Sequence, residues 1–207
     1  MTASLDELIA AARALVAPGQ RRILGIAGPP GAGKSTLAAA VVAALRGDAV
    51  LVAMDGFHLA NGELVRLGRR DRKGAPDTFD AAGFTALLRR LRTADEPLVY
   101  APLFDRSFEE SIAGSVPVAR DVPLVVTEGN YLLLDTGGWA GVRQLLDECW
   151  YVDLDDETRI RRLVARHEAF GKSPADALAW ATGSDATNAA VVATSRHRAS
   201  RWVQLPG

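Results

Sequence analysis

The sequence predicts a three-layer α/β fold built around a mainly parallel, five-stranded sheet. Apolar segments of strand length alternate with helical segments in short steps, an order typical of a sheet covered by helices on both faces. The strand segments are continuously apolar, which indicates strands buried on both sides. The chain has 207 residues, 48% of them hydrophobic, and no internal repeat or linker, so we expect one globular domain.

The first half of the chain is predicted to contain two helices and two strands. Ser4 and Glu7 form an S-x-x-E capping box, which marks the start of a helix that the Pro-Gly pair at 18–19 ends. The alanine-rich second helix is closed by Gly47. Residues 56–79 lack periodicity and are long for a plain connection, so we expect a functional loop there. The four elements are expected at residues 4–16, 23–28, 33–47 and 49–54.

The second half is predicted to alternate in the same way. Asp80 is expected to cap one helix and Asp156 to begin another, and the last helical part is expected to break at Gly171 and Gly183. Residues 102–121 are expected to be irregular. Strands are expected at residues 98–101, 123–129, 149–155 and 202–205, and helices at 80–91, 139–148 and 156–170.

Composition argues against several classes of partner. The 24 basic and 25 acidic residues nearly balance, so bulk charge favours neither nucleic acid nor a membrane surface. Cys149 is the only cysteine, which excludes an internal disulfide and fits a buried thiol in a reducing compartment. The sequence has no signal-peptide pattern and no run of about 18 to 20 apolar residues, so we expect a cytoplasmic protein.

A phosphate-binding motif lies between the first strand and the helix after it. The string "GPPGAGKS", residues 28–35, fits G-x-x-x-x-G-K-[ST]. In such a loop the backbone N–H groups turn around a phosphate, the lysine reaches the β and γ phosphates, and the hydroxyl can ligate Mg²⁺. We therefore expect a nucleoside triphosphate here, with Mg²⁺ on Ser35. The expected nucleotide-binding residues are Gly28, Pro29, Pro30, Gly31, Ala32, Gly33, Lys34, Ser35 and Thr36.

An acid, Asp55, ends the apolar run at residues 50–54. Because ligands bind outside the carboxyl ends of parallel strands, we expect Asp55 to lie on the same edge of the sheet as the phosphate motif. A carboxylate that is simply buried is costly, so this one should face water, a metal or a substrate. Two functional roles fit, a metal ligand or a general base for an attacking hydroxyl, and a capping or water-bound acid is the ordinary alternative.

Five segments together resemble one kinase superfamily. They are "GIAGPPGAGKSTLA", "MDGFHL", "RKGAPDTFD", "YAPLFDR" and "EGNYLLLD". They are similar to the P-loop kinases that include uridine kinase, phosphoribulokinase and bacterial pantothenate kinase, and most similar to the bacterial branch labelled nucleoside/nucleotide kinase or fructose-transport-system kinase. The resemblance spans roughly residues 20–200. It implies a P-loop NTPase fold, a single kinase domain over residues 1–207 with a helical lid at about 159–175, ATP and Mg²⁺, and Asp55 as the catalytic base.

The same resemblance implies roles for other charged residues. Glu128, which ends the strand "PLVVTEG", is implied to associate with Mg²⁺ or to orient the substrate, and a loop cap is the alternative. A Glu where many such strands carry Asp leaves direct ligation open. In the lid, Arg162 or Arg166 is implied to join Lys34 in contacting phosphate during catalysis, ahead of Arg159. A solvated basic helix face would be the ordinary explanation of their spacing.

The acceptor pocket is implied to come from loops. Lys73 lies in "RKGAPDTFD", where turn chemistry and helix capping alone would explain Pro76 and Asp80. Arg106 lies beside aromatic residues, where a guanidinium often grips an anion or stacks. His167, on the apolar side of its helix, is expected to be packed. The expected substrate-binding residues are Phe57, His58, Lys73, Tyr100, Arg106 and Glu128, and Asn188 is a weaker candidate.

These observations lead to one favoured function and one alternative. The favoured function is a kinase that transfers the γ-phosphoryl group of ATP to a hydroxyl of a sugar, nucleoside or pantothenate-like metabolite, acting alone or as a homodimer. The alternative is a nucleotide-dependent switch, although none of the asparagines starts the Asn-Lys-x-Asp motif of guanine-specific switches. A nucleotide kinase would require more acceptor-site arginines than the sequence indicates.

Overall fold

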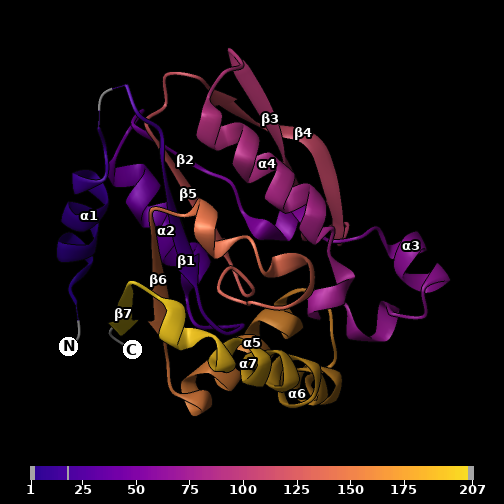
Figure 1. The fold of residues 1–207 in the computed structure, drawn as a ribbon. Coiled ribbons are helices and arrows are strands. Elements are labelled where there is room, and N and C mark those ends of the chain that lie inside the picture. Colours follow the sequence, from indigo (N-terminus) through magenta and orange to yellow (C-terminus); the bar gives the residue numbers. More distant parts are fainter. Residues whose placement is uncertain (1–2, 18, 205–207) are drawn as a thin grey trace.

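The computed structural model describes residues 3–17 and 19–204, and it confirms the predicted α/β fold. Its centre is a five-stranded parallel sheet in the order β2, β5, β1, β6, β7 (Figure 1). The strands are β1 (Arg22–Ala27), β2 (Ala49–Leu51), β5 (Leu124–Gly129), β6 (Glu148–Asp153) and β7 (Arg201–Gln204). Two expected boundary residues, Pro18 and Leu205, lie outside the described residues.

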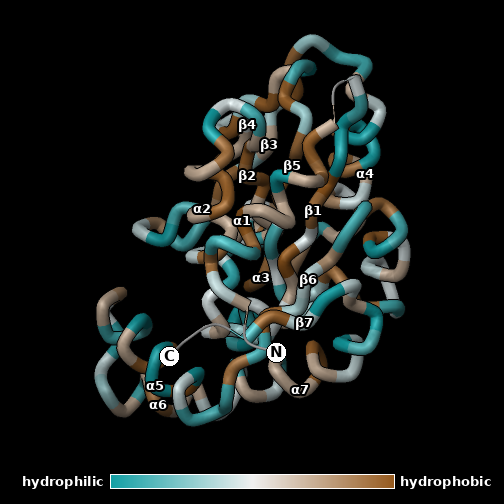
Figure 2. Tube along the Cα trace, turned by 90° about the vertical axis from the view of Figure 1, so that its left-hand side faces the viewer, coloured by the Kyte–Doolittle hydropathy of each residue, from teal (hydrophilic) through white to brown (hydrophobic). Residues whose placement is uncertain are grey.

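The three inner strands β1, β5 and β6 are buried on both sides because their alternate side chains enter two different cores. Leu24 and Ile26 of β1 point into a core with α1 (Leu5–Ala14) and α2 (Lys34–Ala44). Ile23 points into the core on the opposite face, which α4 (Ala81–Thr93) helps to cover. The neighbouring strands alternate in the same way. In Figure 2 these central strands are accordingly mostly hydrophobic.

The expected helix starts are largely confirmed. Ser4 and Glu7 form the capping box of α1, and the Asp80 side chain accepts a hydrogen bond from the Gly83 N–H at the start of α4. The next helix begins at Asp156 as expected, and the preceding Asp155 caps it by accepting a hydrogen bond from the Thr158 N–H. Three helices then gather at one end of the molecule, with breaks near Gly171 and Gly183 as expected (Figure 1). They are α5 (Asp156–Ala169), α6 (Pro174–Thr182) and α7 (Ser184–Thr194).

Residues 102–121 are not irregular, which corrects the sequence prediction. They belong mostly to an antiparallel hairpin of β3 (Leu98–Asp105) and β4 (Glu110–Ala119), which forms a separate two-stranded sheet. Val99, Ala101 and Val118 on its inner side join the core beneath α4. The hairpin therefore places its tip, at residues 106–109, near the carboxyl end of the central sheet.

Three other expectations need correction. The predicted helix at 139–148 is reduced to two 3₁₀ turns at Gly137–Trp139 and Arg143–Leu145. The strand expected to reach Met54 stops at Leu51, and Asp55 lies in a 3₁₀ turn at Met54–Phe57. The loop at 56–79 contains one short helix, α3 (Asn61–Arg66). No described helix combines the length and apolar character needed to cross a membrane.

Candidate active site

The loop between β1 and α2 has the backbone of a phosphate cradle. Gly28, Gly31 and Gly33 all have positive φ, at +151°, +81° and +98°, which residues with a Cβ rarely adopt. A Cβ at Gly28 would also lie 2.6 Å from the Val152 carbonyl oxygen of β6. Glycine is thus required both for the turn and for the close approach of the loop to the sheet. The N-terminus of α2 points into the cavity beside this loop.

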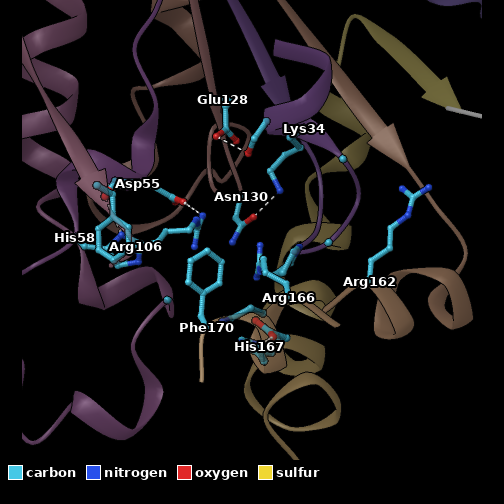
Figure 3. Close-up of a pocket in the computed structure, with 18 of the residues that line it drawn as sticks. Lys34, Asp55, His58, Arg106, Glu128, Asn130, Arg162, Arg166, His167 and Phe170 are labelled. Atoms are coloured by element: carbon cyan, nitrogen blue, oxygen red, sulfur yellow. Dashed lines mark hydrogen bonds and ion pairs between the residues drawn. The ribbon is translucent and has the colours of Figure 1, made fainter. Parts of the chain in front are cut away.

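Lys34, the first residue of α2, is held across the loop (Figure 3). Its ammonium group donates to the Pro29 carbonyl oxygen at 2.9 Å and to Asn130 Oδ1 at 2.8 Å. Burial lowers the pKa of Lys34 to about 8, although the carboxylates of Glu128 and Asp55 oppose this shift. Both acceptors are neutral, so the ammonium charge is available to an incoming anion.

Ser35, in the first turn of α2, and Glu128, near the carboxyl end of β5, are in contact. The Ser35 hydroxyl donates to Glu128 Oε1 at 2.9 Å, and the carboxylate is 6% exposed at the carboxyl end of β5. Burial and the nearby Asp55 charge raise the pKa of Glu128, while Lys34 opposes the shift. A hydroxyl and a carboxylate fit Mg²⁺, which prefers oxygen ligands and keeps few protein ligands when phosphates are present. The described residues contain no cluster of three or more acidic, His or Cys ligands.

Asp55 faces the same cavity from the opposite side, as Figure 3 shows. Its Oδ2 accepts a hydrogen bond at 2.9 Å from Arg106 Nη2, which comes from the tip of the β3–β4 hairpin. Burial opposes ionisation of Asp55, but the neighbouring His58, Arg106 and Lys34 outweigh it and hold the pKa of this carboxyl below its usual range. Its Oδ1 has no hydrogen-bond partner among the described residues, and the side chain is 27% exposed. The ion pair therefore leaves Asp55 open to a hydroxyl.

Of the three arginines of α5 that the sequence singled out, two line the cavity and one does not. Arg162 and Arg166 both line it, on different sides of the phosphate loop (Figure 3). The Arg166 guanidinium has no hydrogen bond or ion pair within the described part of the chain, and burial and the like charge of Arg106 lower its pKa. Arg159 instead lies buried beneath Gly31 and pairs with Asp156 at 3.0 Å. His167 is packed, as expected, and its Nε2 lies 2.8 Å from Asp185 Oδ2.

The remaining wall is aromatic and basic. The ring of Phe104 lies 4.6 Å from that of His58, and Lys73 Nζ lies 5.0 Å from the Phe104 centroid. His58 also stacks on Phe79 at 4.0 Å. Burial lowers the pKa of His58, although the Asp55 carboxylate opposes the shift. The whole cavity has a volume of about 840 Å³, which is large enough for a nucleotide and a second small molecule.

Two of the residues expected to contact substrate do not line the cavity. Tyr100 is 55% exposed on the outer face of β3 and does not line the cavity. Phe57 packs its ring against Phe84 at 5.2 Å, inside the core. The other expected acceptor residues, His58, Lys73, Arg106 and Glu128, all line the cavity, as does Asn188.

Sequence reasoning missed several lining residues. Asn130, two residues beyond Glu128, holds Lys34, and Asp185 holds His167. Phe170 and Trp180 come from the helical end of the molecule. Of these residues, only Asn130 could have been found from the sequence, because it directly follows a strand that ends at the predicted site.

Comparisons with known proteins agree on one group. Residues 23–173 match the model of the phosphoribulokinase / uridine kinase family. An ATP-dependent kinase-like protein of Aspergillus versicolor, notR', is 37% identical over 61% of this chain and 77% of the relative. The uncharacterized protein YggC of Escherichia coli (strain K12) is 32% identical over 94% of this chain and 82% of the relative. A crystal structure from Silicibacter sp. TM1040, provisionally named a fructose transport system kinase, superposes with a TM-score of 0.88, 35% identity and coverage of 97% and 98% of the two chains.

Proposed function

Because the chain belongs to the phosphoribulokinase and uridine kinase family, we propose that it transfers the γ-phosphoryl group of ATP to a hydroxyl of a small metabolite. Family membership makes it an ATP-dependent kinase, and the P-loop kinase fold expected from the sequence is confirmed by the Silicibacter structure. The proposal adds the class of acceptor and the residues that act. One observation carries it: Asp55 and the Ser35–Glu128 pair face each other across a single cavity.

In this proposal the phosphate loop and the helical end of the molecule bind the triphosphate. Backbone N–H groups of the loop and the N-terminus of α2 hold the β and γ phosphates, with Lys34 as their counter-ion. Ser35 and Glu128 would hold Mg²⁺, which when bound neutralises charge on the phosphoryl oxygens. Arg166 offers its unpaired guanidinium to the same group. Residues 159–175 act as a lid of the single domain and exclude water.

The acceptor is activated from the other side of the cavity. Asp55 accepts the proton of the hydroxyl while the hydroxyl oxygen forms a bond to the γ-phosphorus and the bond from phosphorus to ADP breaks. Arg106 holds Asp55 ionised and oriented through Oδ2, which leaves Oδ1 for the hydroxyl. The products are ADP and a phosphate ester, and the proton leaves through Asp55.

Replacement of the proposed base tests this function. We expect Asp55→Asn to lower ADP release with hydroxylated acceptors by about 10²- to 10⁴-fold, because the amide cannot accept the proton. Binding of ATP should survive, since Asp55 does not belong to the phosphate loop. ADP release over a panel of sugars, nucleosides and hydroxy acids gives the first quantity, and calorimetry with ATP gives the second.

Asp71→Asn is the matched control, because Asp71 is exposed on the loop before Lys73 and does not line the cavity. It should keep the turnover of the parent. Equal turnover in Asp55→Asn and the parent would remove Asp55 from the base role. Nucleotide hydrolysis that no acceptor accelerates would instead favour the nucleotide-dependent switch.

A further inference from the structure

A groove between α5 and α6 brings apolar side chains together at the surface of the molecule. Helix α6 packs beside α5, and both lie at the lower end of the molecule in Figures 1 and 2. Ile160 and Val164 of α5 line the groove and are half-buried, and Leu178 of α6 lines it and is 52% exposed. Because soluble proteins rarely leave several apolar side chains grouped in contact with water, this groove indicates a docking surface.

The groove is separate from the substrate cavity, because α5 turns different sides towards the two. Arg162 and Arg166 line the cavity, and Leu163 is buried in the helix packing. The groove is lined instead by α5 residues that recur at helical spacing, namely 157, 160, 161, 164 and 168. No residue lines both the cavity and the groove. A partner bound in the groove would therefore not occupy the substrate cavity.

The rim of the groove carries charges of both signs. Glu157, Arg161 and Glu168 are exposed there, and none of them forms an ion pair with a residue that the structure describes. The Arg161 guanidinium reaches only Thr158 Oγ1 within the described ranges, at 3.5 Å, which is long for a hydrogen bond. A uniformly anionic partner, such as nucleic acid or an acidic membrane, would be repelled by the two glutamates.

A second copy of the chain matches this order of charges. If two α5 helices pack antiparallel about a two-fold axis between Val164 and Ala165, Arg161 of each copy lies opposite the partner's Glu168. Val164 then faces the partner's Ala165 at the centre, and Glu157 lies beyond the end of the partner's helix. The pairing gives two ion pairs around an apolar centre. A register that set Glu157 opposite the partner's Glu168 would place like charges together instead.

We propose that this face of α5 and α6 is the interface of a homodimer, in which Arg161 of each copy pairs with the partner's Glu168 across a two-fold axis. The inference does not depend on the proposed function, because the interface shares no residue with the cavity. Two helices of 14 and 9 residues present a small face, so we expect a weak dimer that dissociates on dilution. Because α5 belongs to the proposed lid, the dimer would hold the lids of the two copies against each other.

Charge reversal on the two sides of the proposed ion pair tests the interface. Sedimentation equilibrium of the parent, at concentrations up to about 10⁻⁴ M, should show a monomer–dimer equilibrium. Arg161→Glu and Glu168→Arg should each weaken self-association by about tenfold or more, because each variant sets two pairs of like charges across the two-fold axis. An equimolar mixture of the two variants should associate again like the parent, since every reversed charge then meets an opposite one.

Glu157→Arg is the matched control, because Glu157 is exposed on the same helix but lies outside the proposed ion pairs. This variant should dimerise as the parent does, and Leu178→Ser should weaken the dimer without changing any charge. A parent that stays monomeric, or single charge reversals that associate as well as the parent, would overturn the inference. A mixture that stays monomeric would do so as well. Recovery of the dimer on mixing cannot arise from misfolded variants, and melting temperatures close to that of the parent verify the fold of each variant alone.

Discussion

At the scale of single residues, Asp147 shows how one carboxylate joins distant parts of the chain. Its oxygens accept hydrogen bonds from Arg22 at 2.6 Å, from the Ile23 N–H at 2.8 Å and from Arg92 at 3.1 Å. Burial opposes ionisation, but these donors outweigh it and lower the pKa of Asp147. The folded state therefore binds the proton less readily than the unfolded chain, and the resulting stability is lost as pH falls through the folded pKa.

We expect Asp147→Asn to reduce the free energy of unfolding at pH 7 by about 2 kcal/mol, because charged hydrogen bonds contribute about 1.5 to 3 kcal/mol. The difference from the parent should persist down to the unfolded pKa of about 3.9 and shrink below it. Urea denaturation at several pH values gives the measurement. Glu63→Gln, which breaks the exposed ion pair with Arg66, should leave the free energy of unfolding nearly unchanged. Similar losses of unfolding free energy in both variants would show that Asp147 stabilises the fold no more than an exposed ion pair does.

Single residues also show where sequence reasoning about the site succeeds. The spacing of the phosphate motif and the ends of apolar runs placed Ser35, Glu128 and Asp55 at one edge of the sheet, which the topology of a parallel sheet requires. Tyr100 does not line the cavity because side chains alternate along a strand: Val99 and Ala101 face the core, so Tyr100 faces outward. The role of Asn130 depends on the path of its loop, which no local pattern specifies.

At the scale of elements, the phosphate loop is fitted against helix α5. A Cβ on Gly31 would lie 2.8 Å from Leu163 Cγ and 2.9 Å from the Arg159 carbonyl oxygen, and the residue has a φ of +81°. We expect Gly31→Ala to lower ATP affinity at least about tenfold, because loop and helix must separate. Calorimetric titration with ATP measures the loss.

Gly47→Ala separates the effect of a strained backbone from the effect of a steric clash between the added Cβ and its neighbours. Gly47 has a similar φ of +84°, but a Cβ there meets nothing within 4 Å. This variant should lose some stability through its strained backbone and keep the ATP affinity of the parent. If Gly31→Ala bound ATP as tightly as Gly47→Ala, close packing between the loop and α5 would have no role in nucleotide binding.

Elements of the central sheet were more predictable than the hairpin, for a physical reason. The buried strands are continuous apolar runs, so their pattern is visible in any short window. The hairpin packs only one face, and its strand β4 contains a glycine and a proline, so local composition indicated a loop. The segment at 139–148 shows the opposite error: its apolar spacing indicated a helix, but only 3₁₀ turns form, and the glycines at 137, 138 and 141 are poor helix formers.

At the scale of the whole molecule, ligand binding should stabilise the fold in a metal-dependent way. A ligand at about 100 times its Kd adds about 2.7 kcal/mol to the free energy of unfolding. We expect ATP with Mg²⁺ to raise the melting temperature more than ATP with a chelator, since Ser35 and Glu128 would hold the metal. Thermal denaturation under both conditions gives the increment that is due to Mg²⁺.

Glu128→Gln should lose most of this increment, and Glu157→Gln, at an exposed position of α5, should retain it. An equal increment in both variants would exclude Glu128 from metal binding.

The overall α/β class was predictable from the alternation of elements, but the strand order was not. Placement of β5 between β1 and β2 depends on crossovers that local sequence does not encode.

The two-sheet construction has a consequence for how this fold diversifies. Phe104, Arg106 and Glu109 all come from one hairpin, whereas the phosphate-binding residues come from the central sheet and its helices. Exchange of that one contiguous stretch would alter one wall of the proposed acceptor site and leave the phosphate loop in place. Proteins with this fold can thus change the metabolite that they phosphorylate by exchanging the hairpin, while the residues that bind the triphosphate stay the same.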